Sequence, residues 1–410
     1  MTEGKLSSHV QTDLDMISRE VPTQRVLELM VQAPEASAQK DRPKLNIALV
    51  IDRSGSMRGD KLEYVKEAAA HVLDLLGEQD RVAIVAYDDT IITLSDSVQI
   101  GPDKRNELKN LVRNLEAGNM TNLGGGWLHG CERIASVKAD GYLNRTLLLT
   151  DGLANVGITD QEELGVHARE LHARGIATST FGVGLGFNEH LLEHMANRGG
   201  GNFYFIEHPR DIPTIFIQEL KELATITARK VLINIGLPKQ VDAQVLGSWE
   251  FERTDDQLRI IVGGIAANQK RELYVRLLTP PQNKRDHLEL TIHCSAENES
   301  GAISGAKSSI IFKYEEQKTV QSASLNKEVM GRFASVQLAD EAIKALKLER
   351  EGRSDEASHL LEMILPANAP YMSEEKVTYY QNLSRRMKKR LTEIDRKTSH
   401  SLNYTSRRPR

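Results

Sequence analysis

The sequence predicts an α/β protein, in which a doubly wound, mostly parallel sheet is inserted within a β-sandwich domain and followed by a C-terminal helical segment. Three observations lead to this prediction. Strand and helix patterns alternate over residues 44–227, short strands with turn formers between them follow over 228–316, and apolar residues recur at helical spacing over 322–396. A length of 410 residues is enough for two or three such domains.

In the α/β region, short apolar runs ended by turn formers predict the strands. These runs span 45–51, 81–87, 146–150, 176–183 and 202–206, and residues 91–98 are expected to form a short edge hairpin. Apolar residues at helical spacing predict helices over 61–76, 103–115, 127–137, 161–174, 189–196 and 211–223. Alternation of this kind is typical of a parallel sheet with helices on both of its faces.

The strands outside this region divide between the two sides of it. Two are expected before it, at 9–16 and 24–31, within an N-terminal segment 8–38. The later strands are expected at 230–235, 241–246, 258–262, 272–278, 287–293 and 308–314. Because an isolated pair of strands is marginally stable, we expect the N-terminal strands to join the later sheet, which makes the domain 44–227 an insertion.

The C-terminal region is predicted to be helical and then basic. The pattern over 322–396 resembles one tetratricopeptide-like helix pair, and since one pair cannot build a repeat core, we expect it to pack on the β-domain. Residues 397–410 are expected to be a disordered basic tail beside a solvated helix face. Docking of this basic region to an acidic partner or to nucleic acid is the alternative.

Composition excludes several classes of protein. The 40% hydrophobic and 27% charged content is that of a soluble globular chain, and a net charge of −4 indicates no particular partner. No signal-peptide core and no stretch long enough to span a membrane is found, so the sequence predicts a cytoplasmic protein. Cys131 and Cys294 are expected to be buried free thiols.

A polar turn follows the apolar run 45–51. It brings Asp52, Ser54 and Ser56 one after another, each separated by one residue. Three oxygen-bearing side chains can therefore converge at the carboxyl end of a buried strand, where open α/β sheets bind their ligands. Oxygen ligands suit a hard cation such as Mg²⁺ or Ca²⁺. The turn alone would also be explained by helix capping, because Ser and Asp accept hydrogen bonds from the first N–H groups of a helix.

The Asp-x-Ser-x-Ser spacing resembles the metal-ion-dependent adhesion site of von Willebrand factor type A (VWA) domains, which are Rossmann-like modules. That motif also needs a threonine and a second aspartate, and Thr121 and Asp151 stand in matching places, before a glycine-rich segment and after a buried strand. The resemblance implies that Ser54, Ser56 and Thr121 contact the metal directly and that Asp52 and Asp151 hold it mainly through water. It implies Mg²⁺, with Mn²⁺ or Ca²⁺ as alternatives.

Residues 8–315 are similar to a group of bacterial VWA proteins, some of them labelled calcium-activated-chloride-channel-like. The likeness is carried by residues 52–57 and 151–157 and by the flanking β-sequence. Bacterial VWA proteins are often found with AAA+ ATPases of the chaperone type, so the resemblance implies such an ATPase as a partner.

Further expectations concern the surroundings of the site. We expect Gly124 to Gly126 to form a flexible loop that lets Thr121 adjust to a ligand. Side chains that could shape a partner surface, each of which could equally be an ordinary loop or capping residue, are Asp88, Asp89, Asn155, Leu185 and Phe187.

Three functions are compatible with such a site. The first, which we favour, is a metal-dependent protein-binding module, a cytoplasmic scaffold or regulatory adaptor whose cation is completed by an Asp or Glu of the partner. The second is a hydrolase that uses the same cation, with His129 as the nearest histidine, although catalytic Mg²⁺ usually has more carboxylates around it. The third is a channel, which the absence of a spanning segment excludes for this sequence. We therefore do not expect an enzyme, and nucleic acid is not an expected partner.

Overall fold

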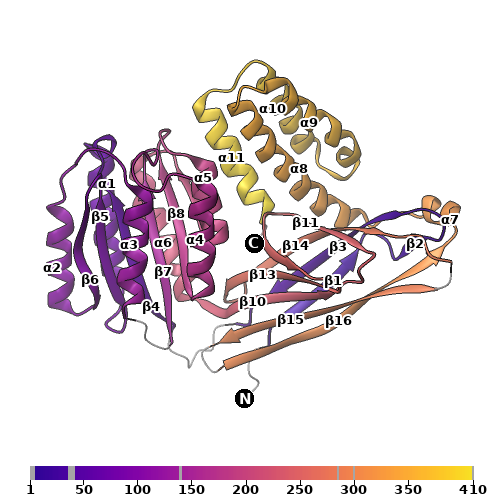
Figure 1. Ribbon diagram of the computed structural model, residues 1–410, viewed down its shortest axis with the longest axis horizontal. Coiled ribbons are helices and arrows are strands. Elements are labelled where there is room, and N and C mark those ends of the chain that lie inside the picture. The colour runs from indigo at the N-terminus through magenta and orange to yellow at the C-terminus, as the bar shows by residue number, and fades with distance from the viewer. Residues whose placement is uncertain (1–4, 36–41, 138–140, 284–285, 299–300, 409–410) are drawn as a thin grey trace. The chain divides into compact units, whose positions relative to one another are not determined.

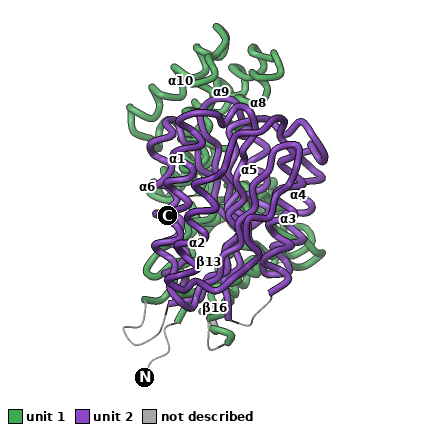
Figure 2. The backbone as a smooth tube through the Cα atoms, turned by 90° about the vertical axis from the view of Figure 1, so that its left-hand side faces the viewer, with its two compact units in different colours: residues 1–36, 227–410 green, residues 37–226 purple. Residues whose placement is uncertain are grey.

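The computed structural model describes residues 5–35, 42–137, 141–283, 286–298 and 301–408 (Figure 1). Residues 36–41 of the expected linker and residues 409–410 of the expected tail lie outside the described residues. The chain divides into two compact units (Figure 2). One contains residues 37–226, and the other combines residues 1–36 with residues 227–410.

The 37–226 unit contains a six-stranded sheet with the strand order β6-β5-β4-β7-β8-β9. The strands are β4 (Lys44–Asp52), β5 (Arg81–Tyr87), β6 (Ile91–Gln99), β7 (Tyr142–Thr150), β8 (Ile176–Val183) and β9 (Gly200–Ile206). All neighbours are parallel except β6, an edge strand that pairs antiparallel with β5. The predicted α/β class with a mostly parallel sheet is therefore confirmed.

Helices cover both faces of this sheet (Figure 1). They are α1 (Asp60–Leu75), α2 (Pro102–Arg113), α3 (Leu123–Ala135), α4 (Gln161–Ala173), α5 (Glu189–Arg198) and α6 (Ile212–Ala224), with the short 3₁₀ turns η1 (Gly55–Met57) and η2 (Pro209–Asp211). Leu49 and Ile51 of β4 belong to the core that α1, α2 and α6 share, whereas Val50 faces Gly130 of α3. The near-continuous burial of β4 follows from this, because each of its faces is covered.

The sheet topology fixes where a ligand site can form. β4 lies between β5, the next strand in the chain, and β7, which comes later, after β6, α2 and α3. The strand order reverses at β4, and the crevice beyond the carboxyl ends of such neighbours is where open α/β sheets bind ligands. Asp52 ends β4 and Asp151 directly follows β7, so the two carboxylates stand at this reversal.

The second unit contains two sheets that share one apolar core and are antiparallel except for the parallel pair β2 and β16. Their strands are β1 (Ser7–Thr12), β2 (Met16–Ser18), β3 (Thr23–Gln32), β10 (Ile226–Gly236), β11 (Asp242–Val245), β12 (Glu250–Arg253), β13 (Gln257–Ala266), β14 (Lys270–Thr279), β15 (His287–Asn298) and β16 (Gly301–Glu315). β3 pairs with β14 along its full length, and β2 pairs with β16. β2 and β3 thus pair with strands that follow the α/β domain, as predicted, and β1 joins the same sheet through β3.

The C-terminal helices are more extensive than the sequence predicts. They are α7 (Gln317–Ser322), α8 (Lys327–Arg350), α9 (Ser354–Asn368), η3 (Ala369–Tyr371), α10 (Glu374–Lys388) and α11 (Glu393–Arg407). The prediction of a disordered tail over 397–410 is wrong for its described part, since residues 397–407 belong to α11. Thr392 and Asp395 form a capping box that starts this helix, and Arg396 donates to the buried Glu349 of α8 at 2.6 and 2.9 Å.

Helix α8 packs on the β-sandwich of its own unit, which was the expected location. Arg332 donates two hydrogen bonds, of 2.7 and 2.9 Å, to the carboxylate of Glu28 on β3. The Tyr274 hydroxyl donates to the same carboxylate at 2.9 Å. Phe333 packs edge-on against the Tyr274 ring with centroids 6.2 Å apart. The charge of the fully buried Glu28 is therefore neutralised by Arg332 of α8, and its carboxylate is also held by Tyr274 of the sheet.

Two expectations from composition concern the cysteines and membrane-spanning helices. Cys131 and Cys294 are both free and buried, as predicted. Across the described part of the chain, none of the helices combines the length and apolar character that crossing a membrane requires.

Candidate metal centre

Asp52 is the most deeply buried member of the centre. It ends β4 with no exposed surface, and its carboxylate accepts hydrogen bonds from the Ser54 amide at 2.8 Å and from the Thr150 hydroxyl at 2.6 Å. Burial raises the pKa of Asp52 to about 6, the hydrogen bonds from Ser54 and Thr150 oppose that rise, and the charge of Asp151 adds to it. The carboxylate is therefore positioned by fixed donors at the start of the polar turn.

The two serines lie beside the second aspartate. Ser54 Oγ is 3.2 Å from Ser56 Oγ, and Ser56 Oγ donates to Asp151 Oδ1 at 2.6 Å. Both serines flank or enter the 3₁₀ turn η1, so the predicted convergence of the turn's side chains is observed. The structure thus connects the end of β4 with the residue after β7 through side-chain oxygens.

Thr121 reaches the same place from a different loop. An ideal Cβ built on Gly152 would lie 3.5 Å from Ser56 Oγ and 3.7 Å from Thr121 Oγ1, so both hydroxyls lie around one point. The Thr121 amide donates to Asn155 Oδ1 at 2.9 Å, and the Asn155 amide donates back to the Thr121 carbonyl at 3.1 Å. Asn155, expected as a rim residue, therefore holds the Thr121 loop on the loop after β7.

The polar turn is tied to the Thr121 loop as well. The Gly55 amide donates to the Asn119 carbonyl at 2.8 Å, and the Gly118 amide donates to the Arg53 carbonyl at 2.6 Å. These backbone hydrogen bonds fix the relative positions of loops that are far apart in sequence. The structure therefore brings the five predicted residues, Asp52, Ser54, Ser56, Thr121 and Asp151, together.

The glycine-rich segment has a different role from the one expected. Gly124 to Gly126 lie in the first turn of α3, which Asn122 caps, and not in a flexible loop. A Cβ on Gly126 would lie 2.5 Å from the ring of Tyr87, and a Cβ on Gly130 would lie 2.3 Å from Val50 Cγ2. These glycines allow α3 to approach the sheet closely, so their conformational freedom does not serve the site.

Two of the expected rim residues are interior instead. Phe187 is 2% exposed, and its ring packs over Gly182 of β8, where it would collide with any Cβ. Asp88 is also buried and pairs with Arg53 at 2.9 Å, while Thr90 donates to it. Leu185 is exposed, as a rim residue must be. Asp89, which is also exposed, is the remaining acidic candidate on this edge.

His129 has no direct contact with the five residues. Its Nε2 lies 2.7 Å from the hydroxyl of Thr93 on the edge strand β6, and its Nδ1 lies 3.5 Å from Glu132. These contacts fit a packing role for His129 on the surface of α3.

Two contributors to the centre were not predicted from the sequence. One is Thr150, the donor to Asp52. The other is Lys61, the second residue of α1, whose ammonium pairs with Asp151 Oδ2 and lies 3.4 Å from the Ser56 carbonyl. The sequence does carry a signal for each of them. Thr150 places a hydroxyl at the end of a fully buried strand, where it needs a hydrogen-bond partner. Lys61 lies at the N-terminus of a helix, where the helix dipole disfavours cations.

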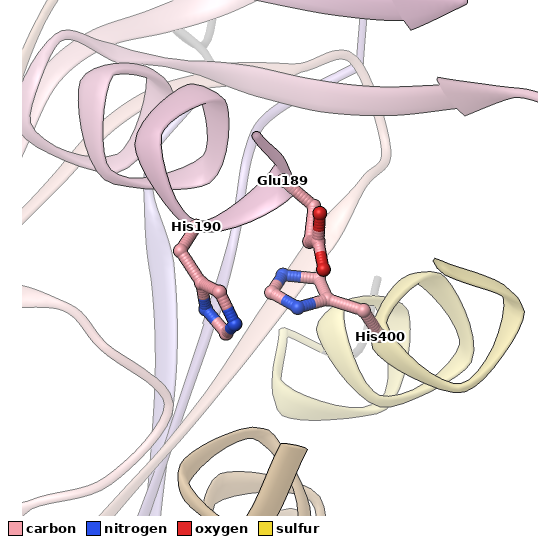
Figure 3. Close-up of side chains that lie close together, drawn as sticks. All are labelled: Glu189, His190 and His400. Carbon is pink, nitrogen blue, oxygen red and sulfur yellow. The ribbon is translucent and has the colours of Figure 1, made fainter. Parts of the chain in front are cut away.

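Other side chains of metal-binding types lie outside this centre. Glu189 and His190 begin α5, and His400 lies on α11 (Figure 3). The two residues of α5 belong to the 37–226 unit and His400 to the other unit. The candidate centre includes none of these three side chains.

The donor set fits a hard divalent cation. Two carboxylates and three hydroxyls supply oxygen ligands, which Mg²⁺ and Ca²⁺ prefer. The hydroxyls are neutral, so the negative charge among the five comes from Asp52 and Asp151. A helix cap would explain the polar turn after β4, but it would not explain why Asp151 accepts from Ser56 and why the Thr121 hydroxyl lies near the same serine.

Comparisons with known proteins agree with this architecture. The family model described as the von Willebrand factor type A domain matches residues 46–218. The chain is 30% identical over 199 residues to YfbK of Escherichia coli, which is 48% of this chain and 34% of YfbK. It is 31% identical over 162 residues to human inter-alpha-trypsin inhibitor heavy chain H3, which is 38% of this chain and 18% of that protein. The matches thus span about a third or less of these relatives.

Similar solved structures extend over almost the whole chain. A von Willebrand factor type A protein from Catenulispora acidiphila has a TM-score of 0.76 at 17% identity, covering 98% of this chain and 96% of that one. The ArnB paralog VWA2 from Sulfolobus acidocaldarius has a TM-score of 0.65 at 18% identity, covering 98% of each chain. At these identities the likeness concerns the fold.

The comparisons do not support the chloride-channel-like grouping that the sequence resemblance implied. The doubly wound sheet, the matched family model and the solved structures agree on the central unit, and residues 46–218 of this chain are a von Willebrand factor type A domain.

Proposed function

We propose that this chain is a metal-dependent protein-binding module, acting as a cytoplasmic scaffold or regulatory adaptor. The observation that supports this most directly is the convergence of five oxygen-bearing side chains from three loops at the strand-order reversal. We assign Mg²⁺, or a similar divalent cation, to Asp52, Ser54, Ser56, Thr121 and Asp151. A bound cation of this class would supply a Lewis-acidic position for one more oxygen ligand.

The residues of the chain prepare this position. Thr150 and the Ser54 amide hold Asp52 in place, and Asn155 holds the Thr121 loop. Because these donors are set before a ligand arrives, little reorganisation opposes binding. A carboxylate of an Asp or Glu is the ligand that such a cation would take in a protein partner.

The surroundings favour a protein over a small substrate. Two large apolar side chains are exposed on the loops that form the site, Met120 at 50% and Leu153 at 56%, and Leu185 on the loop after β8 is 45% exposed. Met120 directly precedes Thr121, and Leu153 follows Asp151 by two residues. Exposed apolar side chains gathered around a polar centre are typical of protein interaction sites. A partner segment that carries an acidic residue beside apolar side chains would fit this surface.

The first test separates the cation from the partner. Isothermal titration calorimetry with Mg²⁺ or Mn²⁺ should show binding to the full chain and none to Asp52→Ala. Asp89→Lys is the matched control, since Asp89 is exposed on the same edge and outside the donor set; it should keep its cation affinity. Equal affinity in Asp52→Ala and in the unaltered protein would disprove the assigned site.

The second test concerns the partner. We expect capture of a protein from native lysate that is lost in excess chelator, restored by Mg²⁺ and lost in Thr121→Ala. An AAA+ ATPase of the chaperone type is the partner class to test first with purified components. Binding that persists in Thr121→Ala with chelator present would rule out the metal-bridged mechanism. Metal-dependent turnover of a small substrate without any partner would instead support the hydrolase alternative.

A further inference from the structure

Lys61 places a positive charge at the proposed cation site. Its ammonium pairs with Asp151 Oδ2, and its Nζ also lies 3.4 Å from the Ser56 carbonyl. The side chain of Asp151 has no exposed surface, whereas that of Lys61 is 32% exposed. Since Ser56 donates to the other oxygen of the carboxylate, both oxygens of Asp151 are engaged by the chain itself.

The position of Lys61 in its helix supports a role in the site. It is the second residue of α1, and cations are disfavoured near a helix N-terminus because the backbone dipole is positive there. An ideal Cβ on Gly184 would lie 3.8 Å from Lys61 Cε, so the loop after β8 passes over the lysine stem. Pairing with Asp151 compensates the unfavourable position of this charge.

Lys61 reduces the net negative charge of the centre. Asp52 and Asp151 carry two negative charges and Lys61 one positive charge, so the centre has a net charge of −1. The nearby Arg53 is paired with Asp88 and does not change this balance. A divalent cation would leave the centre with a net charge of +1, which an anionic ligand would cancel. Without Lys61, the two positive charges of the cation would by themselves neutralise Asp52 and Asp151.

We propose that Lys61 is a specificity-determining residue that makes tight retention of the cation depend on an anionic ligand. The inference rests on the proposed metal site. Repulsion between the ammonium and the cation weakens cation binding when no ligand is present. A carboxylate that completes the site relieves this repulsion, and by linkage the cation and the carboxylate strengthen each other's binding by the same factor. Lys61 would therefore keep the module from holding its metal firmly while no partner is bound.

The experiment compares four full-length proteins by Mn²⁺ titration calorimetry, with and without acetate as the carboxylate probe. They are the unaltered chain, Lys61→Met, Lys61→Arg and Lys66→Met. Lys66 is the matched control because it lies on the same helix, pairs with Glu63 at 2.9 Å and carries the same charge. We expect Lys61→Met to bind Mn²⁺ about tenfold more tightly or better without acetate. We expect Lys61→Arg and Lys66→Met to match the unaltered chain.

Acetate provides the second measurement. It should tighten Mn²⁺ binding to the unaltered chain more than to Lys61→Met, because Lys61→Met has no excess positive charge to cancel. The Tm of each protein, measured in chelator and then in Mn²⁺, provides a readout that does not depend on calorimetry. Lys61→Met should show the largest rise in Tm on adding the ion. Lys61→Gln serves if the methionine variant does not fold.

The outcomes distinguish the two proposals. If the unaltered chain binds Mn²⁺ and neither Lys61→Met nor Lys61→Gln binds more tightly, the role of Lys61 is wrong and the metal site stands. If Lys66→Met tightens binding as much as Lys61→Met, the effect is one of net charge and the specific role is also wrong. If none of the proteins binds Mn²⁺ with or without acetate, the proposed metal function itself fails.

Discussion

Replacing Thr150 with valine tests the support of the buried carboxylate. Valine has nearly the shape of threonine but cannot donate the 2.6 Å hydrogen bond to Asp52. Asp52 has no exposed surface, so water cannot take the place of the lost donor without local rearrangement. The Thr150 hydroxyl also accepts from the Gly152 amide at 3.2 Å, and that weaker contact is lost as well.

The expected loss of stability follows from the charge of the acceptor. A hydrogen bond to a charged group contributes about 1.5–3 kcal/mol, whereas a neutral one contributes about 1 kcal/mol. At pH 7.5 Asp52, with a pKa of about 6, is ionised, and the free energy of unfolding should fall by about 2 kcal/mol. Near pH 5 the carboxyl is largely protonated, and the loss should shrink to about 1 kcal/mol.

Thr180→Val is the matched control. Thr180 lies on the neighbouring strand β8, is equally buried and donates at 2.8 Å to a neutral acceptor, the Leu192 carbonyl. Its replacement should cost about 1 kcal/mol at both pH values. Thr150→Ser keeps the hydroxyl and should restore most of the stability lost in Thr150→Val.

Urea unfolding in excess chelator measures these differences in the free energy of unfolding, provided that the signal comes from the 37–226 unit. The two tryptophans lie one in each unit, so a Trp249→Phe background leaves Trp127 of α3 to report on the α/β domain. Loss of support for Asp52 should also weaken Mg²⁺ binding by about 10–100-fold. A Thr150→Val protein that loses no more stability than Thr180→Val at pH 7.5, or loses the same amount at both pH values, would refute the reasoning.

Three further predictions concern packing and buried charge. Gly126→Ala should destabilise the α/β domain by about 1–3 kcal/mol in urea unfolding, since the added methyl group meets the Tyr87 ring; unchanged stability would show that α3 can shift. Burial, and to a smaller extent the charge of Arg145, lowers the pKa of His172 from 6.5 to about 4. Between pH 6.5 and pH 4 the unfolded chain therefore binds more protons than the folded one, and the free energy of unfolding falls as the pH drops through this range. His172→Gln should remove up to about 3 kcal/mol of that fall, and an identical pH profile in the variant would contradict this. Arg396→Met leaves Glu349 buried without its partner and should cost about 3–5 kcal/mol, detected as early melting of the C-terminal helices in circular dichroism.

The fold class could be predicted from the sequence because it depends on local patterns of apolar residues. Apolar runs such as 45–51 identified buried strands, and alternation with helices identified the parallel sheet. The N-terminal strands could be assigned by reasoning that an isolated pair needs a sheet, and β3 does pair with β14. The polar turn and its two distant companions could be grouped because parallel strands end at a common edge.

Features that depend on contacts between distant segments were missed. The glycines of α3 predict a flexible loop by their composition alone. Their contacts with Tyr87 and Val50, which explain them as sites of close packing, are visible only in the structure. Basic composition suggested a tail after residue 397, but burial of Glu349 gives Arg396 a partner, which local sequence cannot show. Phe187 follows a glycine turn and resembled a rim residue, yet its ring fills the space above Gly182.

The pairing of β3 with β14 has a consequence for synthesis of the protein. Gln32 lies opposite Lys270, so β3, which β1 borders on its other side, waits for roughly 240 residues before its second neighbour leaves the ribosome. At about 5–20 residues per second, the delay is between roughly 12 and 48 s. The 37–226 unit is one continuous stretch of chain and can fold during this interval. A nascent chain of this protein thus carries the β1–β3 pair with one edge of β3 still open after the 37–226 unit has folded, which makes the early strands the segment most in need of protection from aggregation.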